Sequence, residues 1–213
     1  MKKILLACLL IWTISSCEQK SEMPDTLPYR VAKAYGFENF DQVNSIAYTW
    51  NVRRDSVTVV SRDWKWNIKD RTVYYTGSDT SFTYSLDADS LPQRDGAFIN
   101  DKYWLMFPFQ LAWDTGYSFE THENVASPLK GIQSTKLTIL YNSEDGYTPG
   151  DAYDLYLDEN NMILEWTFRR GNGENGATWT WENVQDFGPI KLTMDHMNGE
   201  GERFIWFTNV EVN

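Results

Sequence analysis

The sequence predicts a mainly β fold with some helix (α+β), a single antiparallel meander of about ten or eleven strands curved into an unclosed barrel. Three observations predict it. Polar and apolar residues alternate in many short runs, turn-forming residues separate the runs, and most runs are close enough in sequence to form consecutive hairpins. A helical pattern before the runs and a long apolar segment between them would cover open sheet edges.

The first residues indicate export. Two lysines precede an apolar run that ends at Ile14, which is the charged and apolar pattern of a signal peptide and is too short to span a bilayer. The sequence Ile14-Ser15-Ser16-Cys17 resembles the bacterial lipobox, in which a cysteine after two small residues is acylated. We therefore expect residues 1–16 to be a lipoprotein signal peptide and Cys17 to be the lipid anchor. An ordinary secretory signal with an incidental cysteine is the alternative.

The composition of the remaining chain restricts its function. The leader carries two of the 19 basic residues and none of the 30 acidic ones, so its removal leaves a formal charge of −13. Such a surface repels nucleic acid and anionic headgroups, so membrane attachment is expected through the acylated cysteine. Cys8 leaves with the leader, so a disulfide framework, a zinc cluster or a cysteine nucleophile is not expected.

The length predicts one domain, residues 27–213, after a tether at residues 17–26 that is polar and lacks periodicity. The domain starts with a predicted helix. Leu27, Val31 and Tyr35 fall on one helical stripe, and Gly36 supplies a C-terminal stop.

Strand patterns follow. Near residue 60 the apolar residues change from odd positions (Val57, Val59) to even positions (Val60, Trp64), so a β-bulge is expected there. The first four strands are expected to form a meander before residue 90, and the clearest hairpin is centred on residues 158–161. The predicted strands are 46–53, 56–66, 71–76, 82–86, 117–119, 137–141, 153–157, 162–168, 177–181, 190–194 and 204–212.

Residues 97–114 lose the alternation and are nearly continuously apolar. Pro108 cannot lie inside a central strand and would break a helix near residue 107, so two short helical pieces, or a helix and a turn, are expected. The most apolar part, residues 103–113, is expected either to fill the barrel as a plug or to cover a cavity as a lid.

Aromatic side chains are the main candidates for a binding site, since a minimal core requires fewer of them. Either they are ordinary core or they line an apolar pocket for a lipid or acylated ligand. The candidate ligand-binding residues are Trp50, Trp64, Trp104, Phe107, Phe109, Trp113, Trp166, Trp179, Trp181 and Trp206.

The sequence offers only weak candidates for catalytic or metal-binding residues, so an enzyme, a cofactor and a metal site are not expected. His122 and His196 are far apart in sequence and match neither a metal-ligand nor a triad spacing. The best calcium candidate is the acidic loop Asn142, Glu144, Asp145 and Asp151, although Asp and Asn are also common in solvated turns.

The order of helix, meander, proline-containing apolar segment at residues 104–109 and further hairpins resembles the outer-membrane lipoprotein-sorting family. That family includes a periplasmic lipoprotein carrier, its receptor and mycobacterial lipid-binding relatives. Residues 103–114 and 147–151 more closely resemble uncharacterised lipoproteins of Bacteroidota. The resemblance implies an unclosed barrel that holds acyl chains beneath helices, in the bacterial cell envelope and at the outer membrane. The soluble carrier lacks a lipid anchor, so Cys17 places this chain nearer to anchored members.

The expected function is therefore that of an envelope-anchored lipoprotein binding a lipid, an acyl chain or a lipoprotein, in lipid or lipoprotein trafficking. The alternative is a structural or protein-interaction lipoprotein whose aromatic core is filled. A hydrolase with acidic residues is a third hypothesis, for which the sequence supplies no specific carboxylate pair.

Overall fold

Residues 25–142 and 148–213 are described in the computed structural model of the chain. The predicted signal peptide, Cys17 and nearly all of the tether lie outside the described residues, as do Glu144 and Asp145. No helix in the described ranges is long and apolar enough to cross a membrane.

The described chain is mainly β, with antiparallel sheets and few helices. The elements are α1 (Leu27–Ala34), η1 (Phe37–Gln42), β1 (Ser45–Arg53), β2 (Val59–Asn67), β3 (Thr72–Thr76), β4 (Ser81–Ser85), α2 (Asp95–Trp113), β5 (Tyr117–Ala126), β6 (Gln133–Tyr141), β7 (Ala152–Leu157), β8 (Ile163–Arg169), η2 (Arg170–Asn172), β9 (Ala177–Thr180), β10 (Gln185–Phe187), β11 (Ile190–Leu192), β12 (Asp195–Met197) and β13 (Arg203–Val212).

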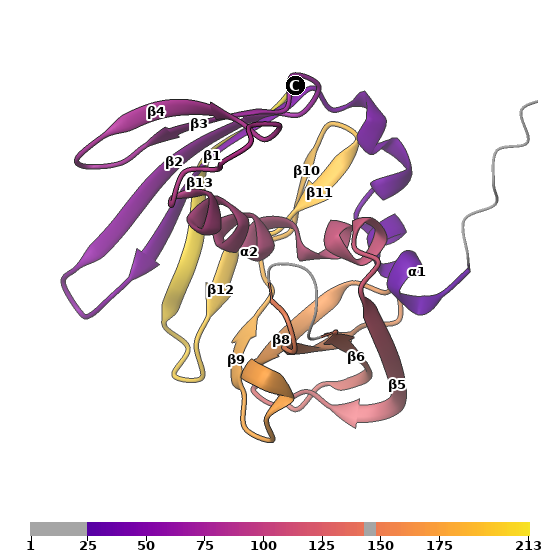
Figure 1. The fold of residues 1–213 in the computed structure, drawn as a ribbon. Helices are drawn as coiled ribbons and strands as arrows, with labels where there is room; N and C mark the ends of the chain where they lie inside the picture. Colours follow the sequence, from indigo (N-terminus) through magenta and orange to yellow (C-terminus); the bar gives the residue numbers. More distant parts are fainter. Residues whose placement is uncertain (1–24, 143–147) are drawn as a thin grey trace, which may run out of the picture.

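The strands form two main sheets and a hairpin, and the prediction of a single meander is wrong. One sheet has six strands in the order β12-β13-β1-β2-β3-β4, a second has five in the order β5-β6-β7-β8-β9, and β10 pairs with β11. The last strand, β13, pairs with β1 (Ile46 opposite Val212), which interrupts the sequential order. Figure 1 shows α2 lying between the two sheets. Within the described residues the sheets do not close into a barrel.

A backbone bridge joins the two sheets. The backbone N–H of Glu182 donates to the Asp195 carbonyl at 2.9 Å, and the Asp195 N–H donates back to Glu182 at 3.2 Å. This bridge joins the chain after β9 to the start of β12, so the two sheets form a continuous curved wall around α2.

Several local predictions are confirmed. The first four strands pair as a meander, and β7 and β8 form the expected hairpin. The first helix ends before Gly36, which has a φ of 92° and approaches the Pro189 carbonyl oxygen so closely that a Cβ would lie 2.5 Å from it. Gly36 is therefore required both by its backbone conformation and by a tertiary contact.

The bulge expected near residue 60 is not formed. Pairing between β1 and β2 runs without interruption from Ser45 opposite Asn67 to Arg53 opposite Val59. Val57 and Val59 are 89% and 44% exposed, so they face solvent and do not share the inward face of Trp64. The parity change in the sequence therefore reflects exposed valines and not a change of register.

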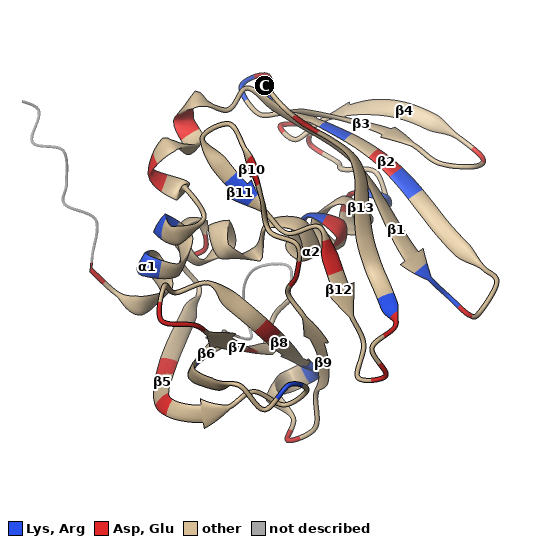
Figure 2. Cartoon of the chain, turned by 180° about the vertical axis from the view of Figure 1, so that it is seen from behind, with Lys and Arg blue, Asp and Glu red and all other residues tan. Residues whose placement is uncertain are grey.

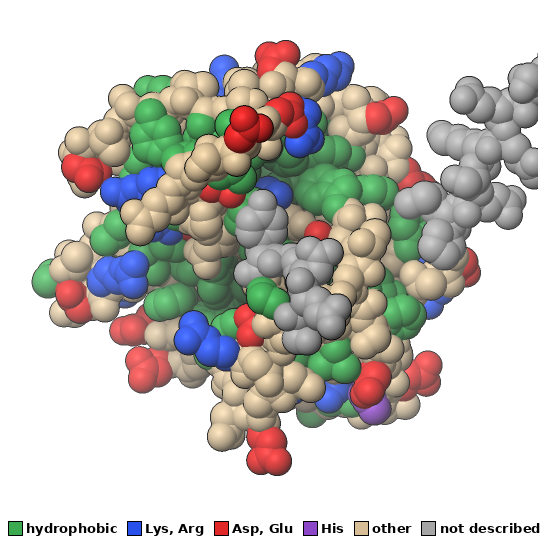
Figure 3. Space-filling view, viewed as in Figure 1, with side chains coloured by type: hydrophobic (Ala, Val, Ile, Leu, Met, Phe, Trp, Pro, Cys, Tyr) green, Lys and Arg blue, Asp and Glu red, His purple; other side chains and the backbone are tan. Residues whose placement is uncertain are grey.

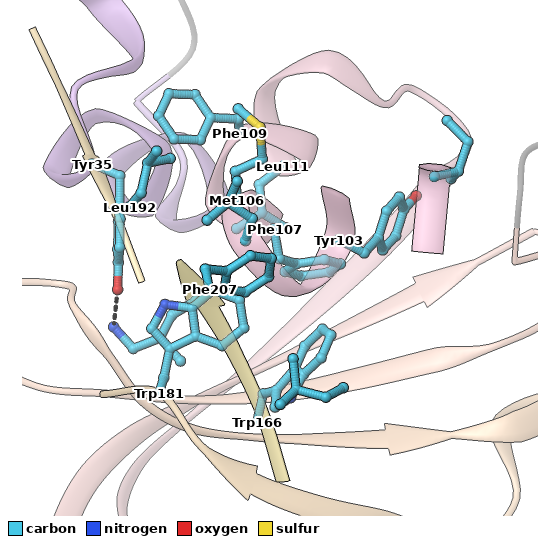
Figure 4. Close-up of a cluster of buried hydrophobic side chains, with 14 of the residues drawn as sticks. Tyr35, Tyr103, Met106, Phe107, Phe109, Leu111, Trp166, Trp181, Leu192 and Phe207 are labelled. Carbon is cyan, nitrogen blue, oxygen red and sulfur yellow. Dashed lines mark hydrogen bonds between the residues drawn. The ribbon is translucent and has the colours of Figure 1, made fainter. Parts of the chain in front are cut away.

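The break in the central helix lies where the proline predicts it. Met106, two residues before Pro108, has non-helical angles (φ −147°, ψ 36°) and divides α2 into two pieces. After the break, Phe107 packs on Tyr153 at a centroid distance of 4.7 Å, whereas Phe109 packs on Phe40 at 5.4 Å. Figure 4 shows Phe109 pointing away from the cluster that Phe107 enters. Successive aromatic side chains thus fill the space on both sides of the helix.

The first piece of α2 is attached to β2 through Asp101, whose side chain is 0% exposed. Its carboxylate accepts two hydrogen bonds from Arg62, at 2.7 and 2.6 Å, and one from the Trp64 indole at 2.8 Å. The Arg62 guanidinium also lies 3.9 Å from the centre of the Trp50 ring. Burial raises the pKa of the Asp101 carboxyl, while the bonds from Arg62 and Trp64 favour its ionised form.

We predict that Asp101→Ala lowers the free energy of unfolding by about 3–5 kcal/mol, because it leaves the Arg62 guanidinium largely buried and unpaired. The control is Asp87→Ala, which breaks the Arg71–Asp87 pair, in which both side chains are 59% exposed. This control should cost about 0–1 kcal/mol. Urea denaturation of both variants measures the difference, and equal losses would contradict the role of Asp101 as an anchor.

Candidate functional site

A pocket of about 290 Å³ remains between the first piece of α2 and the five-stranded sheet. We call it the aromatic pocket. Its apolar walls come from α2, β7, β8 and β9, and they consist of Ile99, Trp104, Tyr153, Trp166, Phe168 and Trp179. Figure 3 shows hydrophobic side chains gathered in hollows near the centre of this face.

Trp104 organises the walls of the aromatic pocket. Its ring meets Trp166 and Trp179 edge to face, at centroid distances of 4.8 and 4.9 Å and interplanar angles of 79° and 83°. Such edge-to-face contacts are favourable for aromatic rings. Trp166 in turn stacks on Tyr153 at 5.4 Å, so rings from four elements, α2, β7, β8 and β9, pack on one another.

The His196 ring contacts the backbone of Trp104. Its Nε2 lies 2.8 Å from the Trp104 carbonyl oxygen and its Nδ1 lies 3.0 Å from the Thr180 carbonyl oxygen. The side chain is fully buried, and burial lowers its pKa to about 4 despite both carbonyl contacts. As a neutral ring His196 carries a single N–H, so it donates a hydrogen bond to only one of the two carbonyl oxygens, and it packs between α2 and the end of β9.

The predicted ligand-binding residues do not come together at one place. Trp104, Trp166 and Trp179 line the aromatic pocket, and Trp113 lines a second pocket on the other side of α2. Those buried in the core, at 0–3% exposure, are Trp50, Trp64, Phe107, Phe109 and Trp181.

Trp206 lies on the outer face of β13, between Arg53 at 6.0 Å and Arg203 at 5.0 Å from its ring centre. Its neighbours in sequence, Ile205 and Phe207, are the residues that point into the core. Trp206 is therefore placed away from both pockets.

Tyr153 and Phe168 line the aromatic pocket, and the sequence analysis did not select them. They are directly opposite each other in the β7–β8 hairpin, with ring centroids 5.3 Å apart. Because Phe168 has the same parity as Trp166 along the strand, the hairpin register could have placed both on one face.

The buried carboxylates that could serve a hydrolase have structural partners. Asp154 pairs with Arg169 at 2.8 Å, Asp195 pairs with Arg203, and Glu165 accepts from the Ser127 hydroxyl and two backbone N–H groups. Among the described residues no group of three His, Cys, Asp or Glu side chains is arranged to hold a metal ion. Asp151 of the predicted calcium loop accepts from the Gly171 N–H at 2.7 Å.

No family model and no curated protein matches the chain. The solved structures that match the chain include two at low identity. A DUF1329 family protein from Desulfovibrio piger is 10% identical over 87% of this chain and 92% of its own, with a TM-score of 0.49. A domain named for outer-membrane lipoprotein sorting, from Vibrio parahaemolyticus, is 11% identical over 79% of this chain and 85% of its own, with a TM-score of 0.44. Similarity at this level does not indicate what this chain binds.

We predict that His196 makes the stability of the fold depend on pH. Its pKa is lowered from 6.5 to about 4, so the unfolded chain takes up a proton before the folded chain does as the pH falls. The folded state should be fully stabilised above about pH 6.5 and should lose about 3 kcal/mol as the pH falls to about 4. Urea unfolding from pH 7 to pH 4 measures this loss.

The variant His196→Gln should have a lower stability at pH 7 but a smaller loss between pH 7 and pH 4, because it lacks the titrating ring. The matched control is His122→Gln, which removes a ring whose side chain is 53% exposed. A pH dependence that is the same in His196→Gln as in the parent would show that other groups are responsible.

Proposed function

We propose that this chain is an envelope-anchored lipoprotein that binds a lipid or an acylated ligand, in lipid or lipoprotein trafficking. The acyl groups on Cys17 attach it to the outer membrane, and the ligand occupies the aromatic pocket. The observation that carries the proposal is a pocket of about 290 Å³ with mostly apolar walls beside α2.

The chemistry of the walls supports this class of ligand. Apolar rings would exclude water from an acyl chain, and each methylene removed from water contributes about 0.8 kcal/mol. Asn100 and Arg170 also line the pocket and offer donors to a polar end of the ligand. Apolar walls with a few polar groups are typical of sites for small ligands.

The size of the ligand is limited by the second piece of α2. Met106, Phe107 and Phe109 are 0–1% exposed and fill the space between the sheets. The pocket therefore has room for part of one acyl chain and not for a complete multi-acylated anchor. This favours a single-chain ligand, or one chain of a larger molecule, over whole-lipoprotein carriage.

The filled centre of the fold also favours the second candidate, an interaction lipoprotein without a small ligand. The described residues bury a continuous aromatic core, and Figure 2 shows acidic residues spread over both sheets and their turns. In that case an outer acidic surface would meet a protein partner, and the aromatic pocket would be a packing defect.

Gly96 provides a way to test occupancy of the aromatic pocket. It lines the pocket, and a Cβ at this position would meet no atom within 4 Å. We predict that Gly96→Trp fills the pocket and weakens binding of a fluorescent acyl probe about tenfold or more. Gly96→Ala adds only a methyl group and should bind as the parent does.

The measurement uses the full chain with Cys17→Ser, so that lipid found in the protein cannot be its own anchor. Mass spectrometry of extracted lipid and titration with the acyl probe are compared for the parent and both Gly96 variants. Thermal unfolding shows whether each variant is folded. If no lipid is extracted and the parent binds no probe, the ligand-binding proposal fails and the interaction lipoprotein becomes the better account.

A further inference from the structure

A second pocket, of about 410 Å³, lies on the other side of the first piece of α2. It is enclosed by η1, by β2 and by the segment between β4 and α2. We call it the Lys102 pocket. Its apolar walls include Phe40, Trp66, Leu91, Phe98 and Trp113, and the charged residues that line it are Lys102, Arg71 and Asp114. Ile99 lines both pockets and separates them.

The Lys102 ammonium lies among three aromatic rings. Its Nζ is 5.2 Å from the centre of Trp66 and 5.7 Å from those of Phe98 and Trp113. The rings attract the positive charge. An ammonium has three N–H donors, however, and within the described part of the chain no oxygen lies within hydrogen-bonding or ion-pairing distance of Nζ.

Two residues that line the same pocket each carry a buried donor without an acceptor. The Trp66 indole nitrogen and the Gln110 amide nitrogen are buried, and neither has a hydrogen-bond partner. Gln110 as a whole is only 4% exposed. Buried donors without acceptors each cost about 1–3 kcal/mol. The Trp66 and Gln110 nitrogens are closed off from solvent, so the Lys102 ammonium is the donor that a ligand in the pocket can reach, and it is complementary to a group that only accepts hydrogen bonds.

The acidic groups nearest to Lys102 are engaged elsewhere. Asp114 accepts hydrogen bonds from the hydroxyls of Tyr141 at 2.6 Å and Tyr103 at 3.2 Å, and Asp95 accepts one from Tyr84 at 2.9 Å. Both carboxylates raise the pKa of Lys102, but burial has the larger effect and lowers it to about 8. At neutral pH most molecules therefore carry a charged ammonium without an ion-pair partner.

We propose that the Lys102 pocket binds an anionic amphiphile, a molecule with one oxyanion group on one apolar chain. The oxyanion accepts hydrogen bonds from Lys102, and the chain packs on Phe40, Leu91 and Trp113. A long-chain carboxylate and an alkyl phosphate share this chemistry. The proposal concerns a different pocket from the proposed function, so either one can fail while the other stands.

The test uses isothermal titration calorimetry on the full chain with Cys17→Ser. The ligands are decanoate, decyl phosphate, the uncharged 1-decanol and the chainless acetate. We expect at least one of the two anionic amphiphiles to bind, and acetate not to bind. Whichever anion binds more tightly identifies the oxyanion that the pocket prefers. Equal binding of 1-decanol and the anions by the parent, or binding of acetate as tight as theirs, would overturn the proposal.

The deciding variant is Lys102→Met, which keeps an unbranched apolar side chain but removes the charge. It should weaken the binding of the anionic amphiphile by about tenfold to a hundredfold and leave 1-decanol unchanged. Lys102→Arg should retain most of the affinity. The matched control is Lys65→Met, at an exposed position on the outer face of β2, which should bind as the parent does.

The pH dependence gives an independent measurement. Because the ligand requires the ammonium form, affinity should fall as the pH rises through about 8, and this fall should be absent in Lys102→Met. Gly96→Trp should not affect binding at Lys102. If Gly96→Trp abolishes decanoate binding and Lys102→Met does not, the anion occupies the aromatic pocket, and the assignment to Lys102 is wrong.

Discussion

The rest of the fold depends on the attachment of α2 to β2 through Asp101. Apolar packing alone would let a helix slide between two sheets, whereas a carboxylate that accepts two bonds from Arg62 and one from Trp64 has a single geometry. This contact fixes the position of the first piece of α2 along β2, and therefore also where the break at Met106 lies relative to the sheet. Both pockets border this piece, so their shapes depend on the same contact.

The break at Met106 also explains why the centre of the fold is filled while its sides are hollow. After it, Phe107, Phe109 and Leu111 are buried and pack in the core between the two sheets. Before it, small and polar residues, Gly96 and Lys102, alternate with large ones and cannot seal the helix against its surroundings. The apolar stretch is therefore mainly a plug, and the space for ligands lies beside its N-terminal part.

The sequence predicts the features that local signals determine: the end of α1 at Gly36, the β7–β8 hairpin and the break near Pro108. It could not predict that β13 pairs with β1, because alternation shows that a segment is a strand but does not select its partner. In β13 the four consecutive residues 204–207 are all apolar, so alternation does not show which of them face the core, and the structure places Trp206 on the outer face. Lys102 is conspicuous only once Trp66, Phe98 and Trp113 are placed around it.

An unpaired cation is unexpected in a chain with 30 acidic and 19 basic residues, where carboxylates are in excess. The nearby carboxylates of Asp114 and Asp95 do not pair with Lys102, and one oxygen of each accepts hydrogen bonds from tyrosine hydroxyls instead. The negative charge of the whole chain also repels free anions. A small anion would gain only the contact with Lys102, whereas a chain on the same anion gains about 0.8 kcal/mol for each methylene buried. The net charge opposes all anions alike, so burial of an apolar chain is what would favour an amphiphilic anion over a small one.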